Sequence, residues 1–337
     1  MVTEETAGEA AGETDSETPA VVAVGSAIVD HNYRLSNLPE PDGGAFVREE
    51  WTGFGGVAGN VACAASRLGR EAGVIARVGA ADADAVVGDL RDRGVDTARI
   101  RRGEEAPTYS MVLRGPTGER MVLTGGEASE ALRLAPADWP YLEAAGVVVT
   151  SAYAPDPVVT ALLAARREGR IEALAFDLSG PLSELQTRGV APGTIDDAAA
   201  TADLFVAGEV ALGSYCSHHG VDVDAGNEER AVELLRDLGL TRGALTRGES
   251  GSVLVTPGRR VRVPAFDVAV ADETGAGDAF VAGLVDAWLL DDRDAADAGR
   301  HAAAVAALNC TGTGARGGLP TRESVAAFRE ARCGADS

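Results

Sequence analysis

The chain has 337 residues, enough for one large α/β domain with a buried core or for such a domain with a smaller accessory piece. The 52 acidic residues outnumber the 30 basic ones, and the resulting formal charge of −22 disfavours nucleic acid and anionic lipid as partners. All 30 basic residues are arginines, and the absence of lysine excludes a Walker-type phosphate loop, a protein-kinase fold and a pyridoxal enzyme.

An acidic chain without lysine is typical of organisms that keep molar salt in the cytoplasm, where screening mutes the repulsion between carboxylates. The alternative is an acidic protein from an ordinary high-GC bacterium. The cysteines are widely spaced, which indicates reduced thiols instead of a disulfide framework or a zinc site. No stretch reaches the roughly 18 apolar residues of a membrane span, and the N-terminus is acidic, so we expect a cytoplasmic protein that binds no membrane.

The first 19 residues are acidic and small, which predicts a disordered acidic tail. After it, short apolar runs alternate with amphipathic segments. The runs predict buried strands at 21–24, 73–78, 147–150, 173–177, 204–207 and 243–246, and the segments between them predict helices at 60–68, 84–93, 156–167 and 228–238. This alternation predicts an α/β class fold over residues 20–335, a layered α/β/α domain with a mostly parallel central sheet.

Two segments, 33–54 and 107–124, are extended and lack a helical period. They predict a small β lid. Their aromatic residues either contact a ligand under this lid or join the small sheet to itself or to a second subunit.

The sequence DETGAGDAF at 272–280 precedes an apolar run that predicts a helix over 279–290, buried almost all round and interrupted only by Gly283 and Asp286. The first turn, formed by Gly275, Ala276, Gly277 and Asp278, directs backbone N–H groups at whatever lies in front of it and can bind an anion. Asp278 is placed to accept a hydroxyl proton. Taken alone, the same motif is also compatible with simple helix capping.

Two further segments place polar side chains beside glycines. The sequence GFGGVAGN at 53–60 puts Gly55 and Gly56 before a small-residue helix that begins near Asn60, and Asp30 follows the strand at 21–24. Asn60 and Asp30 can bind ligand hydroxyls at the carboxyl end of a sheet. The alternatives are that the small residues around Asn60 serve tight helix packing and that Asp30 is a turn carboxylate. His301 is interpreted as an ordinary helix residue.

Together, in this order and spacing, these motifs resemble the ribokinase-like carbohydrate kinases of the phosphofructokinase-B type over roughly residues 20–332, including the stretches at 77–97, 243–255 and 312–328. The resemblance implies an ATP-dependent kinase that transfers the γ-phosphoryl group to a sugar hydroxyl. Asp278 would be the base, and Gly275, Ala276 and Gly277 would form the anion hole. The residues implied to contact the sugar are Asp30, Gly55, Gly56 and Asn60.

The resemblance also implies a nucleotide site and two ion sites. The ATP site would be lined by Thr246, Arg247, Gly248, Gly251 and Asn309. Glu209 would hold Mg²⁺ through water, and Asp272 with Thr274 would help to bind a monovalent cation such as K⁺. The chain departs from common family patterns at Glu273, Val57, Ile28 and Val206.

The acceptor is expected to contain ribose, because Gly25-Ser26 looks more like the start of ribokinases and nucleoside kinases than the Gly-Glu of fructokinases. Ribose, a nucleoside or ribose 1-phosphate would fit. Arg48, Arg114 and Arg120 in the lid either pair with a substrate phosphate or are solvated. Fructose or 2-keto-3-deoxygluconate is the alternative acceptor, and a catalytically silent ligand-binding relative is the alternative of another class. Lid-mediated dimers are frequent in this family, so a homodimer is expected.

Overall fold

The computed structural model of the chain describes residues 19–223 and 228–333. The predicted acidic tail at 1–19 lies outside the described residues except for Pro19.

Within the described residues, nine strands form one main sheet. In spatial order they are β13 (Arg259–Val263), β12 (Ser252–Thr256), β11 (Gly243–Thr246), β10 (Leu204–Gly208), β9 (Leu174–Asp177), β8 (Val147–Ser151), β1 (Val21–Gly25), β4 (Ala72–Gly79) and β5 (Asp96–Gly103). The strands from β11 to β5 are parallel, while β12 and β13 add an antiparallel edge. The predicted fold class is therefore confirmed.

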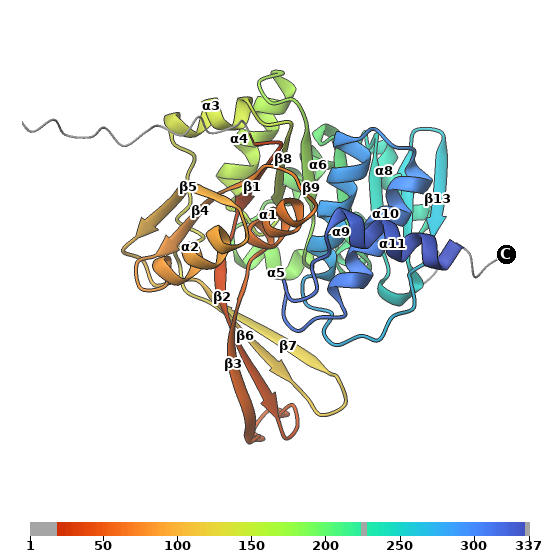
Figure 1. The fold of residues 1–337 in the computed structure, drawn as a ribbon. Coiled ribbons are helices and arrows are strands. Elements are labelled where there is room, and N and C mark those ends of the chain that lie inside the picture. The colour runs from red at the N-terminus through yellow and green to blue at the C-terminus, as the bar shows by residue number, and fades with distance from the viewer. Residues whose placement is uncertain (1–18, 224–227, 334–337) are drawn as a thin grey trace, which may run out of the picture.

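Helices cover both faces of the main sheet (Figure 1). Alternate residues of each strand point to opposite faces, so Val22 and Val24 pack against one helical layer while Val21 packs against the other. The first layer contains α4 (Asp156–Arg167), α6 (Pro192–Thr201), α7 (Glu209–His218) and α8 (Glu229–Asp237). The second contains α1 (Val57–Arg67), α9 (Ala276–Leu284), α10 (Ala295–Asn309) and, over β1 and β4, α2 (Ala83–Asp92).

Shorter or peripheral helices complete the described part of the chain. They are η1 (Pro136–Asp138), α3 (Trp139–Glu143), α5 (Leu182–Thr187), η2 (Gly248–Ser250) and α11 (Arg322–Cys333). Among the described residues, no helix has the length and apolar character that crossing a bilayer requires.

A second, four-stranded sheet forms the lid. Its order is β3 (Val47–Gly55), β2 (Ile28–Leu35), β6 (Tyr109–Arg114) and β7 (Arg120–Gly125), and it projects away from the body (Figure 1). The lid starts before the expected boundary at 33, because Ile28 already pairs with Gly55.

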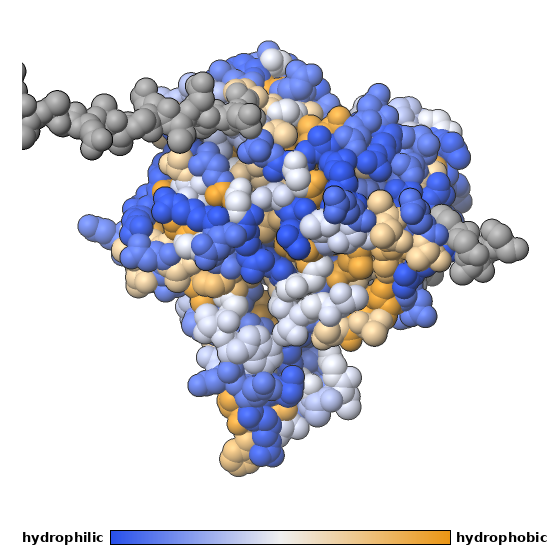
Figure 2. Space-filling view, viewed as in Figure 1, coloured by the Kyte–Doolittle hydropathy of each residue, from blue (hydrophilic) through white to orange (hydrophobic). Residues whose placement is uncertain are grey.

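Figure 2 shows a largely hydrophilic body with hydrophobic residues toward the far end of the lid. The exposed apolar side chains of the lid are Phe46, Val47, Met121, Val122 and Leu123.

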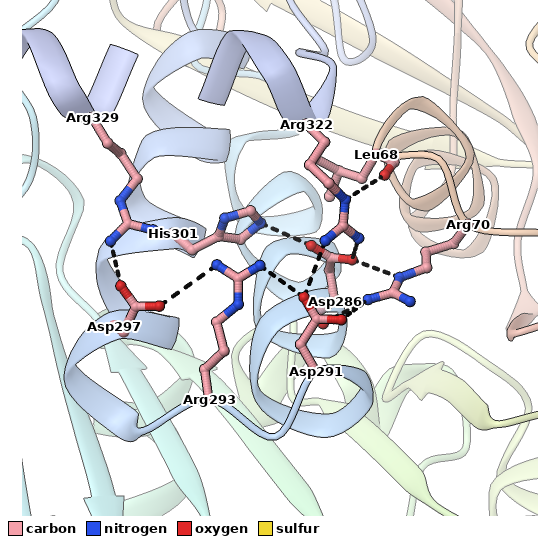
Figure 3. Close-up of polar contacts among 9 residues, drawn as sticks. All are labelled: Leu68, Arg70, Asp286, Asp291, Arg293, Asp297, His301, Arg322 and Arg329. Atoms are coloured by element: carbon pink, nitrogen blue, oxygen red, sulfur yellow. Dashed lines mark hydrogen bonds and ion pairs between the residues drawn. The ribbon is translucent and has the colours of Figure 1, made fainter. Parts of the chain in front are cut away.

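The sequence predicted one regular helix after DETGAGD. The structure differs from this prediction. Helix α9 ends at Leu284 and continues as the π-helical turn η3 (Val285–Leu290), which contains the buried Asp286. Figure 3 shows Arg70, Arg322 and His301 directed at this carboxylate. Arg70 Nε donates to Asp286 Oδ1 at 2.7 Å, and His301 Nε2 lies 3.0 Å from Asp286 Oδ2. His301 is thus part of a buried ionic cluster instead of an ordinary helix residue.

Candidate active site

The predicted site residues gather at the edge of the main sheet where parallel strands have their carboxyl ends. There β1 ends at Gly25, β9 at Asp177, β10 at Gly208 and β11 at Thr246. In open α/β sheets this edge is where ligands bind.

The start of helix α9 leaves open space in front of it. Gly275 caps the helix with a φ of 77°, and a Cβ there would lie 2.3 Å from the carbonyl oxygen of Ala315, so this position requires glycine. A Cβ on Gly277 would meet no protein atom within 4 Å. The N–H groups of Gly277 and Asp278 belong to the first turn, where a helix offers amides without intrahelical acceptors, whereas the N–H of Ala276 donates to the Glu273 carbonyl at 3.1 Å.

Asp278 is the third residue of α9 and is half-buried. The pKa of its carboxyl group is raised to about 7, chiefly by burial; a hydrogen bond from Asn60 and the charge of Arg316 lower this pKa, and the nearby carboxylates of Asp177 and Asp30 raise it. A carboxylate with a pKa near neutrality is well suited to act as a general base.

Asn60 and Asp30 lie near Asp278. Asn60 Nδ2 donates to Asp278 Oδ2 at 2.7 Å, and Ser110 Oγ on lid strand β6 donates to Asp30 Oδ1. Burial raises the pKa of Asp30, although the bond from Ser110 lowers it. A Cβ at Gly55 would lie 2.2 Å from Asp30 Oδ2, so the missing side chain makes room for this carboxylate.

Gly56, predicted beside these residues, caps helix α1 with a φ of 88°. A Cβ there would lie 2.6 Å from the Ser26 carbonyl oxygen. Its role visible in the fold is to bring α1 against the end of β1.

A cavity of about 300 Å³ lies at the carboxyl ends of β10 and β11. It is lined by Ser179, Gly180, Glu209, Thr246, Arg247 and Gly248, among others. The structure therefore brings together four residues that the sequence placed in a nucleotide and magnesium site. Glu209 is the first residue of α7, and its side chain is exposed.

Gly251 and Asn309, also predicted for the nucleotide site, are not among the residues that line this cavity. A Cβ at Gly251 would lie 2.2 Å from the Val263 carbonyl oxygen. Asn309 is fully buried, and its Nδ2 donates to the Ala315 carbonyl at 3.1 Å. In this structure both residues hold loops in place.

Asp272 and Thr274, predicted to help bind a monovalent cation, are hydrogen-bonded to each other, and a lid guanidinium lies on them. Arg114 NH2 lies 2.8 Å from Asp272 Oδ2 and 2.9 Å from Thr274 Oγ1, and Arg120 NH1 donates to Thr274 Oγ1 at 3.0 Å. Burial raises the pKa of Asp272, but hydrogen bonds from Thr274 and Gly314 and the charge of Arg114 give a net lowering. The carboxylate is therefore ionised and held by the lid.

Two site residues were missed by the sequence analysis. Asp177 ends β9, and burial raises its pKa to about 6. Asp177 ends the apolar run ALAFD, and a carboxylate at the carboxyl end of a buried strand could have been predicted as a site residue. Arg316 binds Asn60 from a loop far along the chain, and nothing in its local sequence indicates this contact.

Comparison with known proteins identifies the family of the chain. Residues 18–322 match the pfkB family carbohydrate kinase. An ATP-dependent ribose-1-phosphate kinase of Halopiger xanaduensis is 31% identical over 316 residues, covering 93% of this chain and 98% of that protein. A 2-dehydro-3-deoxygluconokinase of Bacillus subtilis is 27% identical, covering 83% and 87%. The structure of Arabidopsis thaliana ribokinase complexed with ribose and ATP has a TM-score of 0.79 at 22% identity, covering 92% of this chain and 98% of that one.

The family match spans most of the chain, and the related kinase from Halopiger xanaduensis is similar over nearly its whole length. The chain therefore belongs to the pfkB family of carbohydrate kinases, which are phosphotransferases with an alcohol group as acceptor.

Proposed function

We propose that the protein transfers the γ-phosphoryl group of ATP to a hydroxyl of a ribose-containing sugar, and that ribose 1-phosphate is the preferred acceptor. The similarity to a ribose-1-phosphate kinase supports the ribose-containing class. The observation that carries the choice of a phosphorylated sugar is the position of Arg114.

The charge of Arg114 acts on both Asp30, at the proposed sugar site, and Asp272, at the start of the anion-hole loop. Its Nε is buried and has no hydrogen-bond partner among the described residues. A buried donor without a partner is costly, and an anionic oxygen of the acceptor would satisfy it. A phosphate group on the sugar supplies such an oxygen, whereas unphosphorylated ribose does not.

In the proposed reaction the acceptor hydroxyl lies at Asp278, with Asp30 and Asn60 holding the sugar. Asp278 accepts the hydroxyl proton as the oxygen attacks the γ-phosphorus and the bond to the ADP oxygen breaks. The first-turn N–H groups of Gly277 and Asp278 stabilise the charge on the transferring group.

ATP would bind in the cavity beside Thr246, Arg247 and Gly248. The exposed carboxylate of Glu209 in the same cavity is the kind of oxygen ligand that Mg²⁺ prefers, directly or through water. Mg²⁺ when bound neutralises phosphate charge.

The exposed apolar side chains on β3 and β7 of the lid would be covered in a homodimer. A monovalent cation at Asp272 would share its ligands with Arg114.

A coupled assay of ADP production over ribose, nucleosides, ribose 1-phosphate, fructose and 2-keto-3-deoxygluconate, in molar KCl, tests the proposal. We expect the highest kcat/KM with ribose 1-phosphate. A higher value with fructose or 2-keto-3-deoxygluconate would overturn the proposed acceptor, and no turnover with any sugar would favour a silent ligand-binding relative.

A further inference from the structure

Arg316 lies in the loop between α10 and α11, yet its side chain is only 3% exposed. Its Nε donates to Asn60 Oδ1 at 2.8 Å, and its NH2 donates to the Gly55 carbonyl oxygen at 2.8 Å. Its NH1 pairs with Asp89 on α2. A planar guanidinium held by partners on three segments has a fixed orientation.

This orientation determines how Asn60 presents its amide group. Because Asn60 Oδ1 accepts from Arg316, the amide nitrogen must face the other way, and there it donates to Asp278 Oδ2 at 2.7 Å. Asp278 Oδ2 is thereby engaged, which leaves Oδ1 to face an acceptor hydroxyl.

The space for Arg316 depends on a glycine in helix α1. A Cβ at Gly59 would lie 2.4 Å from Arg316 NH2. Any larger residue at position 59 would displace the guanidinium while leaving its charge in the protein.

Charge around Asp278 also depends on Arg316. Asp177 from β9 and Asp30 from β2 place negative charge near the Asp278 carboxylate, Asn60 from α1 donates to it, and Arg316 supplies positive charge. Without Arg316, the two neighbouring carboxylates would be less compensated.

From these contacts we infer that Arg316 is a positioning residue that acts on Asp278 in two ways, through Asn60 by orienting its amide and directly by offsetting the negative charge around the carboxylate. The inference rests on the proposed function in taking Asp278 as the base.

The first experiment compares Arg316→Gln, Arg316→Lys, Asn60→Ala and the double variant Arg316→Gln/Asn60→Ala. Arg316→Gln should lower kcat roughly 10- to 100-fold, because the base is misaligned, and should leave the KM for ATP within about twofold. The acid limb of kcat/KM should move up by about 1 pH unit. Arg316→Lys retains the positive charge, so its acid limb should lie at the wild-type pH. Its kcat should stay low, because the Lys ammonium does not hold the Asn60 amide.

In the Asn60→Ala background, with kcat measured at a pH above the acid limb, Arg316→Gln should cost less than about threefold, because the orienting effect passes through Asn60. Additive losses in the double variant would overturn the inference. Gly59→Ala, which moves the guanidinium without removing it, should reproduce the fall in kcat. Thermal unfolding of each variant identifies any that fail to fold.

The second experiment needs no substrate. The Asp278 carboxyl carbon, assigned by its loss in Asp278→Asn, is titrated by ¹³C NMR in the wild-type protein and in Arg316→Gln. A higher titration midpoint in the variant supports the inference, and an unchanged midpoint overturns it. The matched control is Arg102→Gln, which removes an arginine from an exposed pair with Asp84 on the same helix α2 and should leave the titration unchanged.

The two experiments separate the two claims. If the wild-type protein phosphorylates none of the sugars, the proposed function fails, while the NMR titration still decides whether Arg316 controls Asp278.

Discussion

Arg114 of lid strand β6 lies 2.8 Å from Asp272, on the loop that leads into helix α9. The Asp272 carboxylate is only 3% exposed and also accepts from the backbone N–H groups of Thr274 and Gly314. The lid is therefore joined by charge-assisted hydrogen bonds to the segment that leads into the proposed anion hole.

Arg114→Met removes this connection while keeping a long apolar side chain. We expect kcat/KM for ribose 1-phosphate to fall roughly 100-fold, and to fall less for ribose, because both the lid contact and the partner of the sugar phosphate are lost. Steady-state kinetics with both sugars measure this difference. The control is Arg48→Met, since Arg48 lies over the Phe46 ring, 5.9 Å from its centroid, and should change neither value. Equal losses for the two sugars in Arg114→Met would argue against phosphate recognition.

The rate should depend on pH through Asp278. Its pKa is raised to about 7, and only the deprotonated form accepts a proton, so kcat/KM should be maximal above pH 7 and should fall about tenfold per unit well below it. Asp177, with a pKa raised to about 6, titrates nearby, so the observed limb belongs to both groups. Asp278→Asn should lose about 10³-fold in kcat, and unchanged activity in this variant would refute the assignment of the base.

Two glycines of the same turn should respond differently to alanine. Gly275→Ala places a Cβ against the Ala315 carbonyl in a left-handed conformation and should destabilise the fold by more than about 1 kcal/mol. Gly277→Ala meets no protein atom within 4 Å and should keep the melting temperature. Its methyl group would occupy open space beside the first-turn N–H groups proposed to bind the transferring phosphoryl group, so activity should still fall. Calorimetry on the two variants measures the loss of stability, and kinetics measures the loss of activity. A Gly277→Ala enzyme with wild-type activity would contradict the expected role of this position.

The buried cluster in Figure 3 should contribute strongly to stability. Asp286→Asn leaves Arg70, Arg322 and His301 without their shared carboxylate, and we expect the free energy of unfolding to fall by roughly 3 kcal/mol. Urea denaturation at fixed salt measures this loss. Asp84→Asn is the control, because the Asp84 carboxylate is 88% exposed in its pair with Arg102 and should contribute less than about 0.5 kcal/mol. Equal losses in the two variants would contradict the expected role of the cluster.

The lid should mediate self-association. Val122 and Leu123 on β7 are 51% and 52% exposed, and replacing both with glutamate should convert a dimer into monomers in sedimentation at molar KCl. Val210, which is 75% exposed on α7, far along the chain from the lid, provides a control substitution that should leave the dimer intact. A wild-type protein that sediments as a monomer would rule out the proposed dimer.

The sequence predicted the fold well, because the strands and the helix starts depend on local patterns. Buried parallel strands are short apolar runs, and the glycines before α1 and α9 mark helix starts. The contacts of Arg316 with Asn60 and of Arg114 with Asp272 were not predictable in this way. Each joins residues more than a hundred positions apart, and a single chain gives no local signal for such a pair. The cytoplasmic location and the halophilic origin stay predictions.

Only Ser26 and Ala27 separate the end of β1, in the main sheet, from the start of β2, in the lid. Asp30 on β2 and its hydrogen-bond partner Ser110 on β6 lie side by side in register, so both belong to the lid. Asn60 and Asp278 lie on helices α1 and α9 of the body. Movement of the lid would therefore carry the proposed sugar contact Asp30 relative to the proposed base, and the two would face one sugar only when the lid lies against the body.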